Sequence, residues 1–287
     1  MQYATIYFIS DKMSAGKYIL VNGTFFPSDE YRISLQESDA FLFAEKIRAV
    51  RTAFPFFSET LERIKLELLL FNQSFPEFTD KNGQGLKRQL ERTLTKNKQF
   101  LGARLTIRFR LYDQKIHYTI QSEKLENADY ELNEKGLYID IIDKIQKPVS
   151  SLSHLAIGSE IYWDIAKNHL QNTSVDQLFL VNSDDYIIEA PESNIYLITG
   201  NQISGASCDH GSFLDISQPH LLEIFDKLNL EYSEDKGITI QDLRKADEIM
   251  IANAIEGIKW IVGFEGKRYF NNTIRKISDG FNRNKIN

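Results

Sequence analysis

The chain has 287 residues, of which 42% are apolar and 12% aromatic, enough for one large domain or two of moderate size. Charged residues make up 26% and the formal net charge is −6, so nothing in the composition indicates binding to nucleic acid or to an anionic membrane. The single cysteine, Cys208, rules out an internal disulfide framework, and the first ten residues lack the basic and apolar regions of a signal peptide, so we expect a soluble, cytoplasmic protein.

The N-terminal half begins with strand-like segments. Residues 3–10 and 17–27 alternate in polarity, and Asn22-Gly23 in the second segment is a good hairpin turn. Residues 38–52 fit a strand or a helix equally well. After Pro55, helical spacing of apolar residues predicts a helix with Ser58 as its N-cap.

A second amphipathic helix is expected after a glycine-rich turn, within residues 81–100, and two alternating strands follow at 103–112 and 115–125. A turn near Asp113 separates these strands. Residues 123–135 are polar, charged and without periodicity, which is typical of a domain boundary. We therefore predict an N-terminal domain over residues 1–122 and a C-terminal domain over 123–287, with a cleft between them.

The C-terminal half alternates irregularly between strands and helices. Helices are predicted within residues 159–171 and 219–230, and the predicted strands cover 136–143, 175–182, 185–190, 193–199, 238–240 and much of 246–264. Hairpin-like pairs among these strands indicate an α+β fold in two domains.

Glu189 interrupts an apolar, β-branched stretch, "IIEAPESNIYLI", at residues 187–198. Two interpretations are open from the residues alone. Glu189 is either the end of a strand that faces water, or an anion held in place to meet a cationic group.

Glu189 with Ser193, Asn194 and Ile195, followed some sixty residues later by "ADEIMIANAIEGIKWI", resembles the class IV, fold-type-IV pyridoxal-phosphate enzymes. This family includes branched-chain and D-amino-acid aminotransferases and aminodeoxychorismate lyase. The resemblance covers nearly the whole chain and implies a two-domain α+β homodimer that binds pyridoxal phosphate.

The resemblance assigns cofactor contacts residue by residue. Glu189 would pair with the protonated pyridine nitrogen, which lets the ring accept electron density from the substrate. Arg63 would bind the phosphate, in a helix where Thr60 replaces the family's usual histidine. Further contacts would come from Ser193, Asn194 and the loop Asn253, Ala254 and Ile255. The alternative for Arg63 is an exposed arginine on a helix. The alternative for the loop is an ordinary transition from strand to turn.

The resemblance fails at the lysine that would hold the cofactor as a Schiff base. Its position falls on Ala156, a shift of register offers only Ser150 or Ser151, and no lysine lies between Lys147 and Lys167. The family's Gly-Asp-Gly-x-Phe-Glu-Thr segment falls on residues 44–50 without its glycines or glutamate. Its Gly-Ile-x-Arg turn, which binds the phosphate at a helix N-terminus in the family, falls near residues 213–220. This segment lacks the arginine, and Asp215 nearby would oppose an anion.

The sequence gives little support for a metal site or a nucleotide-binding site. The five histidines show no zinc-like spacing with each other or with Cys208, and no phosphate loop or dinucleotide-binding motif occurs. We therefore expect a divergent homologue, a pseudoenzyme without a catalytic lysine, that binds a small anionic ligand or a partner protein. The alternative is an active pyridoxal-phosphate lyase or aminotransferase that acts on aminodeoxychorismate or an amino acid.

Overall fold

The computed structural model describes residues 15–235 and 237–285, which divide into two compact units. The first unit ends at Ala128 and the second begins at Asp129. The residues just before Ala128 stay with the first unit because they bond to it. The Leu125 N–H donates to the Gly102 carbonyl at 3.0 Å, and Arg48 donates to the Asn127 carbonyl at 3.1 Å.

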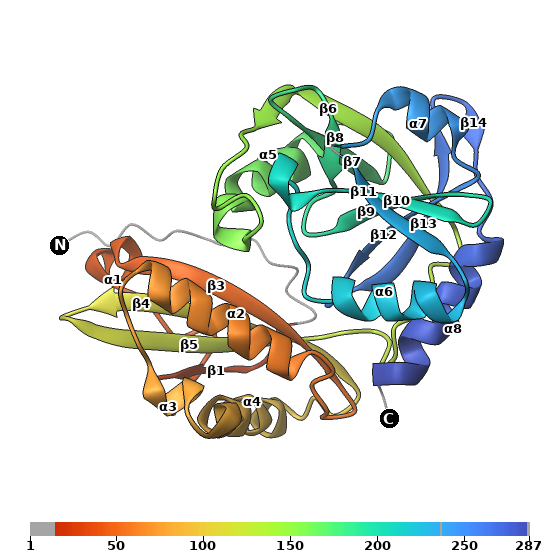
Figure 1. Ribbon diagram of the computed structural model, residues 1–287. Coiled ribbons are helices and arrows are strands. Elements are labelled where there is room, and N and C mark those ends of the chain that lie inside the picture. The colour runs from red at the N-terminus through yellow and green to blue at the C-terminus, as the bar shows by residue number, and fades with distance from the viewer. Residues whose placement is uncertain (1–14, 236, 286–287) are drawn as a thin grey trace. The chain divides into compact units, whose positions relative to one another are not determined.

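The first unit contains a five-stranded antiparallel sheet in the order β2-β1-β5-β4-β3 (Figure 1). Its strands are β1 (Tyr18–Val21), β2 (Thr24–Pro27), β3 (Phe41–Val50), β4 (Gly102–Tyr112) and β5 (Lys115–Lys124). The Asn22-Gly23 hairpin is confirmed: both residues have positive φ, 46° and 83°, as a type I′ hairpin turn requires. The strand expected at residues 3–10 lies outside the described residues.

The helices of the first unit are α1 (Leu35–Asp39), α2 (Phe57–Leu70), α3 (Pro76–Thr79) and α4 (Gln84–Asn97), with a 3₁₀ turn at Lys81–Gly83. The prediction that Ser58 is the N-cap of α2 is wrong. The helical ladder begins earlier, because the Thr60 N–H already donates to the Phe56 carbonyl at 3.0 Å, so Phe56 is the N-cap. The ambiguous residues 38–52 are mainly the strand β3, which pairs along its whole length with β4.

The second unit contains a mixed nine-stranded sheet in the order β11-β10-β9-β12-β13-β6-β7-β8, with β14 paired to β13. Its strands are β6 (Leu137–Lys147), β7 (Gln177–Asn182), β8 (Ile187–Glu189), β9 (Asn194–Thr199), β10 (Gln202–Ala206), β11 (Glu231–Asp235), β12 (Glu248–Asn253), β13 (Gly257–Phe264) and β14 (Lys267–Arg268). The strand predicted at residues 238–240 is wrong. Ile238 forms one isolated bridge with Ile187, and Thr239 then caps a helix through a capping box.

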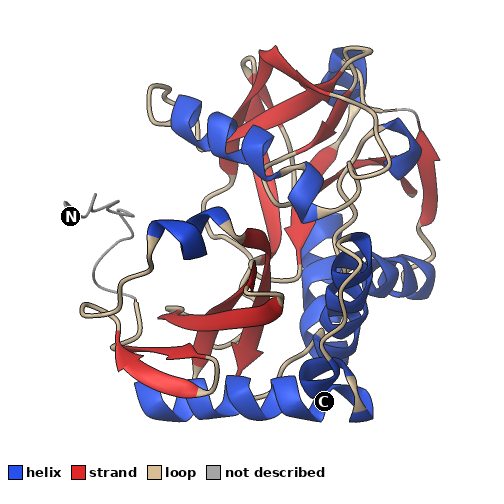
Figure 2. Cartoon of the chain, turned by 90° about the vertical axis from the view of Figure 1, so that its left-hand side faces the viewer, coloured by secondary structure: helices blue, strands red, loops and turns tan. Residues whose placement is uncertain are grey.

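The helices of the second unit are α5 (Glu160–Leu170), α6 (Gln218–Lys227), α7 (Ile240–Lys245) and α8 (Asn272–Lys285), with 3₁₀ turns at Ala156–Gly158 and Cys208–His210. Helices and strands occur together in both units, which confirms the α+β class (Figure 2). Within residues 15–235 and 237–285, no helix is long and apolar enough to cross a membrane.

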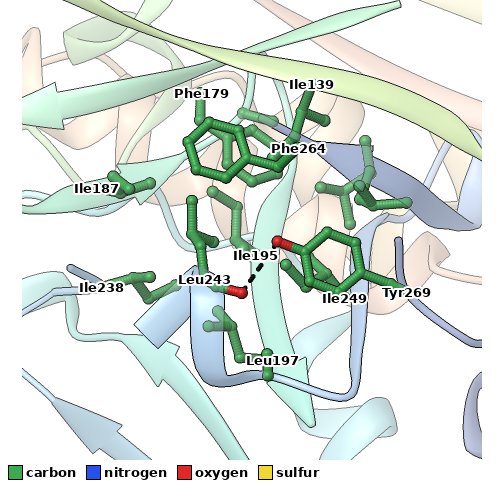
Figure 3. Packing of buried hydrophobic residues seen from close by; sticks show 14 of the residues in the cluster. Ile139, Phe179, Ile187, Ile195, Leu197, Ile238, Leu243, Ile249, Phe264 and Tyr269 are labelled. Atoms are coloured by element: carbon green, nitrogen blue, oxygen red, sulfur yellow. Dashed lines mark hydrogen bonds between the residues drawn. The ribbon is translucent and has the colours of Figure 1, made fainter. Parts of the chain in front are cut away.

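The main core of the second unit forms where β7, β9, β12 and β13 meet α7 (Figure 3). Ile195 and Leu197 on β9 pack with Ile249 on β12, and all three side chains are at most 3% exposed. The Tyr269 hydroxyl at the edge of this core donates to the Leu243 carbonyl at 2.9 Å, so its polar end is satisfied. This apolar core supports the strands that carry the polar residues described next.

Candidate functional site

Glu189 is the last residue of β8 and pairs with Leu180 of the neighbouring strand β7. Its side chain is 0% exposed, so the interpretation of a strand end that faces water is wrong. A carboxylate without solvent needs donors from the protein. The environment of Glu189 therefore decides what it can bind.

Three donors from the same unit surround the Glu189 carboxylate. The Lys147 ammonium lies 2.7 Å from Oε2, the Phe213 N–H donates to the same oxygen at 2.5 Å, and the Trp163 indole N–H donates to Oε1 at 2.7 Å. Lys147 is also 0% exposed, and its ammonium donates to the Ser153 carbonyl at 2.8 Å. The cation that Glu189 meets is therefore a lysine of its own chain.

A bulge in β6 places Lys147. The pairing of β6 with β7 is regular up to Ile142 and resumes only at Gln146, so Lys147 lies opposite Asn182. Leu180 and Asn182 are two residues apart on β7, so their side chains share one face of the sheet. Glu189 lies opposite Leu180, hence Lys147 and Glu189 share that face across β7. Re-aiming a side chain in this way is typical of bulges.

Burial is the largest influence on both ionisable groups. It raises the pKa of Glu189 and lowers the pKa of Lys147, while their mutual attraction and hydrogen bond oppose both shifts. The Trp163 and Phe213 donors also act to lower the pKa of Glu189. Removal of either partner would leave the other charge buried without compensation.

Trp163 and Phe213 belong to a second apolar cluster that also includes Ile142, Leu178 and Leu180. Their rings pack edge to face with centroids 4.9 Å apart. Ala156, at the start of a 3₁₀ turn, packs against this same cluster. The residue predicted at the Schiff-base position thus lies beside the donors to Glu189, and an alanine methyl supplies no nucleophile there.

Asn194 connects Glu189 to the start of α6. Its side-chain amide donates to the Phe213 carbonyl and its oxygen accepts from the Asp215 N–H at 3.0 Å. The Asp215 carboxylate in turn accepts from the Ser217 N–H at 2.8 Å and from the Ser217 hydroxyl. Ser217 is the N-cap of α6, so a carboxylate already occupies donors at this helix N-terminus.

The turn after β12 is closed by its own first residue. The side-chain oxygen of Asn253 accepts from the Ile255 N–H at 2.8 Å and the Glu256 N–H at 2.6 Å. The Asn253 amide donates to the Ser193 hydroxyl at 2.8 Å, and the Ala254 carbonyl accepts from a tyrosine hydroxyl. The structure therefore brings Ser193 and the Asn253 turn together, with these backbone donors already used internally.

Arg63 lies on α2 in the first unit and forms an ion pair with Glu45 of β3, with 3.5 Å between Nε and Oε1. Both side chains are nearly buried, at 9% and 4% exposure, so the alternative of an exposed helix arginine is wrong. Thr60 donates to the Phe56 carbonyl and is fully buried. Arg63 and Glu189 belong to different units, so their convergence on one cleft stays a prediction.

Cys208 is half-buried, and burial raises its pKa to about 11, which disfavours a reactive thiolate. In the part of the chain that the structure describes, no three histidine, cysteine, aspartate or glutamate side chains are grouped to hold a metal ion.

Lys147, Trp163 and Phe213 were not predicted from the sequence as partners of Glu189. Lys147 ends a strand-like segment that was expected to stop at residue 143, and nothing local to the sequence indicates a bulge. One signal was available in the sequence: a carboxylate in an apolar strand needs a cation. Lys147 is the first lysine on the N-terminal side of Ala156.

Comparison with known proteins agrees with this fold. The sequence profile of the family Amino-transferase class IV matches residues 43–262. The sequence has no significant match among curated proteins.

Solved structures of branched-chain aminotransferases are similar to this chain. That of Escherichia coli has a TM-score of 0.79 at 11% identity, covering 92% of each chain. That of Thermoproteus uzoniensis has a TM-score of 0.78 at 15% identity, covering 93% of this chain and 94% of that one. That of Thermobaculum terrenum, in its pyridoxal-phosphate form, has a TM-score of 0.74 at 13% identity, covering 93% of each. With the profile spanning most of its length, the chain belongs to the class IV aminotransferase family.

Proposed function

We propose that this chain is a divergent member of the family that does not carry out pyridoxal-phosphate-dependent aminotransfer. The observation that carries the proposal is the buried contact of 2.7 Å between Lys147 and Glu189. In the family, this glutamate meets the protonated ring nitrogen of the cofactor. Here an ammonium group of the chain already holds that position, and two further donors engage the same carboxylate.

The positions expected to hold the cofactor phosphate, including the N-terminus of α6, are also engaged within the chain. Asp215 accepts from Ser217 at the N-terminus of α6, Asn253 accepts from the turn that follows it, and Arg63 pairs with Glu45. A bound phosphate would compete with a carboxylate at the first and third of these positions. The residues present therefore do not fit the cofactor.

The alternative of an active enzyme requires another lysine, and Lys147 is the candidate nearest to Glu189. The ring nitrogen and the aldehyde carbon of pyridoxal phosphate lie at opposite ends of the pyridine ring. A lysine that touches the glutamate at the nitrogen end cannot also reach the aldehyde. The position of Lys147 therefore favours the non-catalytic homologue over the active enzyme.

Pyridoxal phosphate added to the purified protein, followed by borohydride and peptide mass spectrometry, tests this proposal. We expect no aldimine absorption band and no pyridoxyl group on any lysine above the level of a denatured sample. The E. coli branched-chain aminotransferase, treated in the same way, is the positive control. A stoichiometric pyridoxyl-lysine in this chain, at Lys147 or elsewhere, would establish the active enzyme instead.

A small anionic ligand remains the best-supported binding partner. In the first unit, β3, β4 and β5 carry basic residues on the face of the sheet that points away from α2 and α4. Among the described residues of these three strands, one acid lies on the same face. The basic residues are Lys46, Arg48, Arg104, Arg108 and Arg110, with the acid Glu123 paired to Arg104. A face of this charge favours anions, and guanidinium groups favour carboxylates and phosphates.

Thermal-shift measurements with citrate, phosphate and a neutral sugar test the anion proposal. We expect the anions to raise the melting temperature at equal ionic strength, and Arg108→Gln/Arg110→Gln to reduce that rise at least severalfold. The exposed pair Lys87→Gln/Arg88→Gln on α4 is the control. Equal shifts in the double variant and in its control would contradict binding at this face.

A homodimer in the cytoplasm is proposed from the family likeness. Leu66, Leu69 and Leu70 support the dimer, because they form a row on α2 with exposures of 42%, 69% and 49%. Light scattering should give twice the 33.2 kDa of one chain. A monomer at high protein concentration would contradict this proposal.

A further inference from the structure

We infer that Lys147 is an intramolecular ligand: its ammonium group occupies a site for a small organic cation, formed by the Glu189 carboxylate and the Ser153 carbonyl. This inference deepens the proposed function, because it states what holds the position that a cofactor ring would need. It also predicts which chemical species replaces Lys147 when the lysine is removed.

The site has the features of a built cation site. Two oxygens converge on one nitrogen, with distances of 2.7 Å to Glu189 and 2.8 Å to Ser153. The Ser153 carbonyl is held in place by a second donor, the hydroxyl of the fully buried Ser159, at 3.1 Å. Glu189 is fixed from its other side by the Trp163 indole. The acceptors are therefore held by groups other than Lys147 itself, and truncation of the lysine leaves them positioned.

The β6 bulge brings Lys147, and not the preceding lysine of the same strand, to this site. If the ladder from Ile142 continued without interruption, the residue opposite Asn182 would be Lys144 rather than Lys147. Lys144 is instead exposed within the bulge. One strand thus carries two lysines three residues apart, of which one is exposed and the other fully buried. This pair provides a matched control for every measurement on Lys147.

The substitution Lys147→Ala keeps Cβ and removes three carbons and the nitrogen, the heavy atoms of n-propylamine. We expect Lys147→Ala to lower the melting temperature, and n-propylammonium chloride at millimolar concentration to restore most of the loss. The effect should rise with ligand concentration as expected for a ligand that binds only the folded state. Sodium chloride or 1-propanol at the same concentration should have little effect, and Lys144→Ala should respond to none of them.

The double variant Lys147→Ala/Glu189→Gln separates a cation site from simple filling of space. Without the carboxylate, n-propylammonium should no longer stabilise the protein. Equal rescue by propanol, or rescue that persists in the double variant, would overturn the inference. Rescue of the variants by n-propylammonium does not depend on whether the native chain binds pyridoxal phosphate. Failure of the inference and failure of the proposed function can therefore be distinguished.

A measurement on the native protein covers the case in which Lys147→Ala does not fold. Brief acylation with acetyl N-hydroxysuccinimide, followed by peptide mass spectrometry, should modify Lys144 and leave Lys147 unmodified. In urea, both should react to the same extent. Acylation of Lys147 at the rate of Lys144 in the folded protein would show that the ammonium is not held in the site.

Discussion

Replacement of Lys147 by methionine should destabilise the second unit in a way that depends steeply on pH. Methionine keeps most of the volume, so the main effect is the loss of the charge beside Glu189. Without that charge, burial raises the pKa of Glu189 further above its ordinary value of 4.5. If Glu189 takes up a proton at pH 7, the cost is about 3.4 kcal/mol, at about 1.36 kcal/mol per pH unit. This figure limits the part of the loss at pH 7 that comes from the ionisation of Glu189.

The sign follows from proton linkage. Below pH 4.5 the carboxyl is protonated in both the folded and the unfolded variant, so the penalty vanishes. As pH rises, the unfolded state releases its proton while the folded state keeps it, and stability falls until the folded pKa is passed. We therefore expect the penalty to be larger at pH 7 than at pH 5, by at most about 2.7 kcal/mol over these two pH units, at about 1.36 kcal/mol per pH unit.

Urea unfolding followed by tryptophan fluorescence measures this effect, because Trp163 and Trp260 both belong to the second unit. Lys144→Met is the matched control: an exposed lysine on the same strand should change stability by less than about 0.5 kcal/mol at either pH. A penalty for Lys147→Met that is equal at pH 5 and pH 7, or as small as that of Lys144→Met, would refute the buried ion pair.

Three further variants test the rest of the network by urea unfolding at pH 7. Asn253→Ala removes the acceptor for two backbone N–H groups and should cost about 2–3 kcal/mol, whereas a loss below 0.5 kcal/mol would contradict the closed turn. Gly257→Ala should cost about 2–4 kcal/mol, because φ is +75° and a Cβ would lie 2.8 Å from the Tyr130 ring; full tolerance would contradict this backbone geometry. Tyr196→Phe should be neutral or up to about 1 kcal/mol stabilising, since the buried Tyr196 hydroxyl has no hydrogen-bond partner among the described residues. A clear loss would reveal a bound partner there.

Local sequence patterns predicted most of the helices, strands and turns that depend on residues close together in the chain. The hairpin at Asn22-Gly23 required two residues with positive φ, and those residue types supply it. The alternating strands before and after Asp113 paired as expected. The N-cap at Ser58 was wrong because a capping residue type is common, and only the position of the first helical hydrogen bond decides which residue is the cap.

The environment of Glu189 could be predicted only as a pair of alternatives. An acid in an apolar strand indicates either solvent or a cation, and the identity of the cation depends on a contact between residues 42 positions apart. That contact requires the β6 bulge, for which residues 143–145 carry no specific sequence signal. The family resemblance directed attention to Ala156, the position predicted for the family's lysine, and not to Lys147, which contacts Glu189.

The proposal that the chain keeps the family's fold without its chemistry has a physical basis in the way its groups are held. The fold depends on apolar contacts such as those of Ile195, Leu197 and Ile249, which involve no cofactor atom. The polar groups that a cofactor would satisfy are buried, so in a chain that binds no cofactor each of them needs a partner from the protein. Lys147 supplies a cation at Glu189, and Asp215 supplies an anion at α6. Since both replacements are charged and come from the chain itself, folding of the second unit should require no ligand.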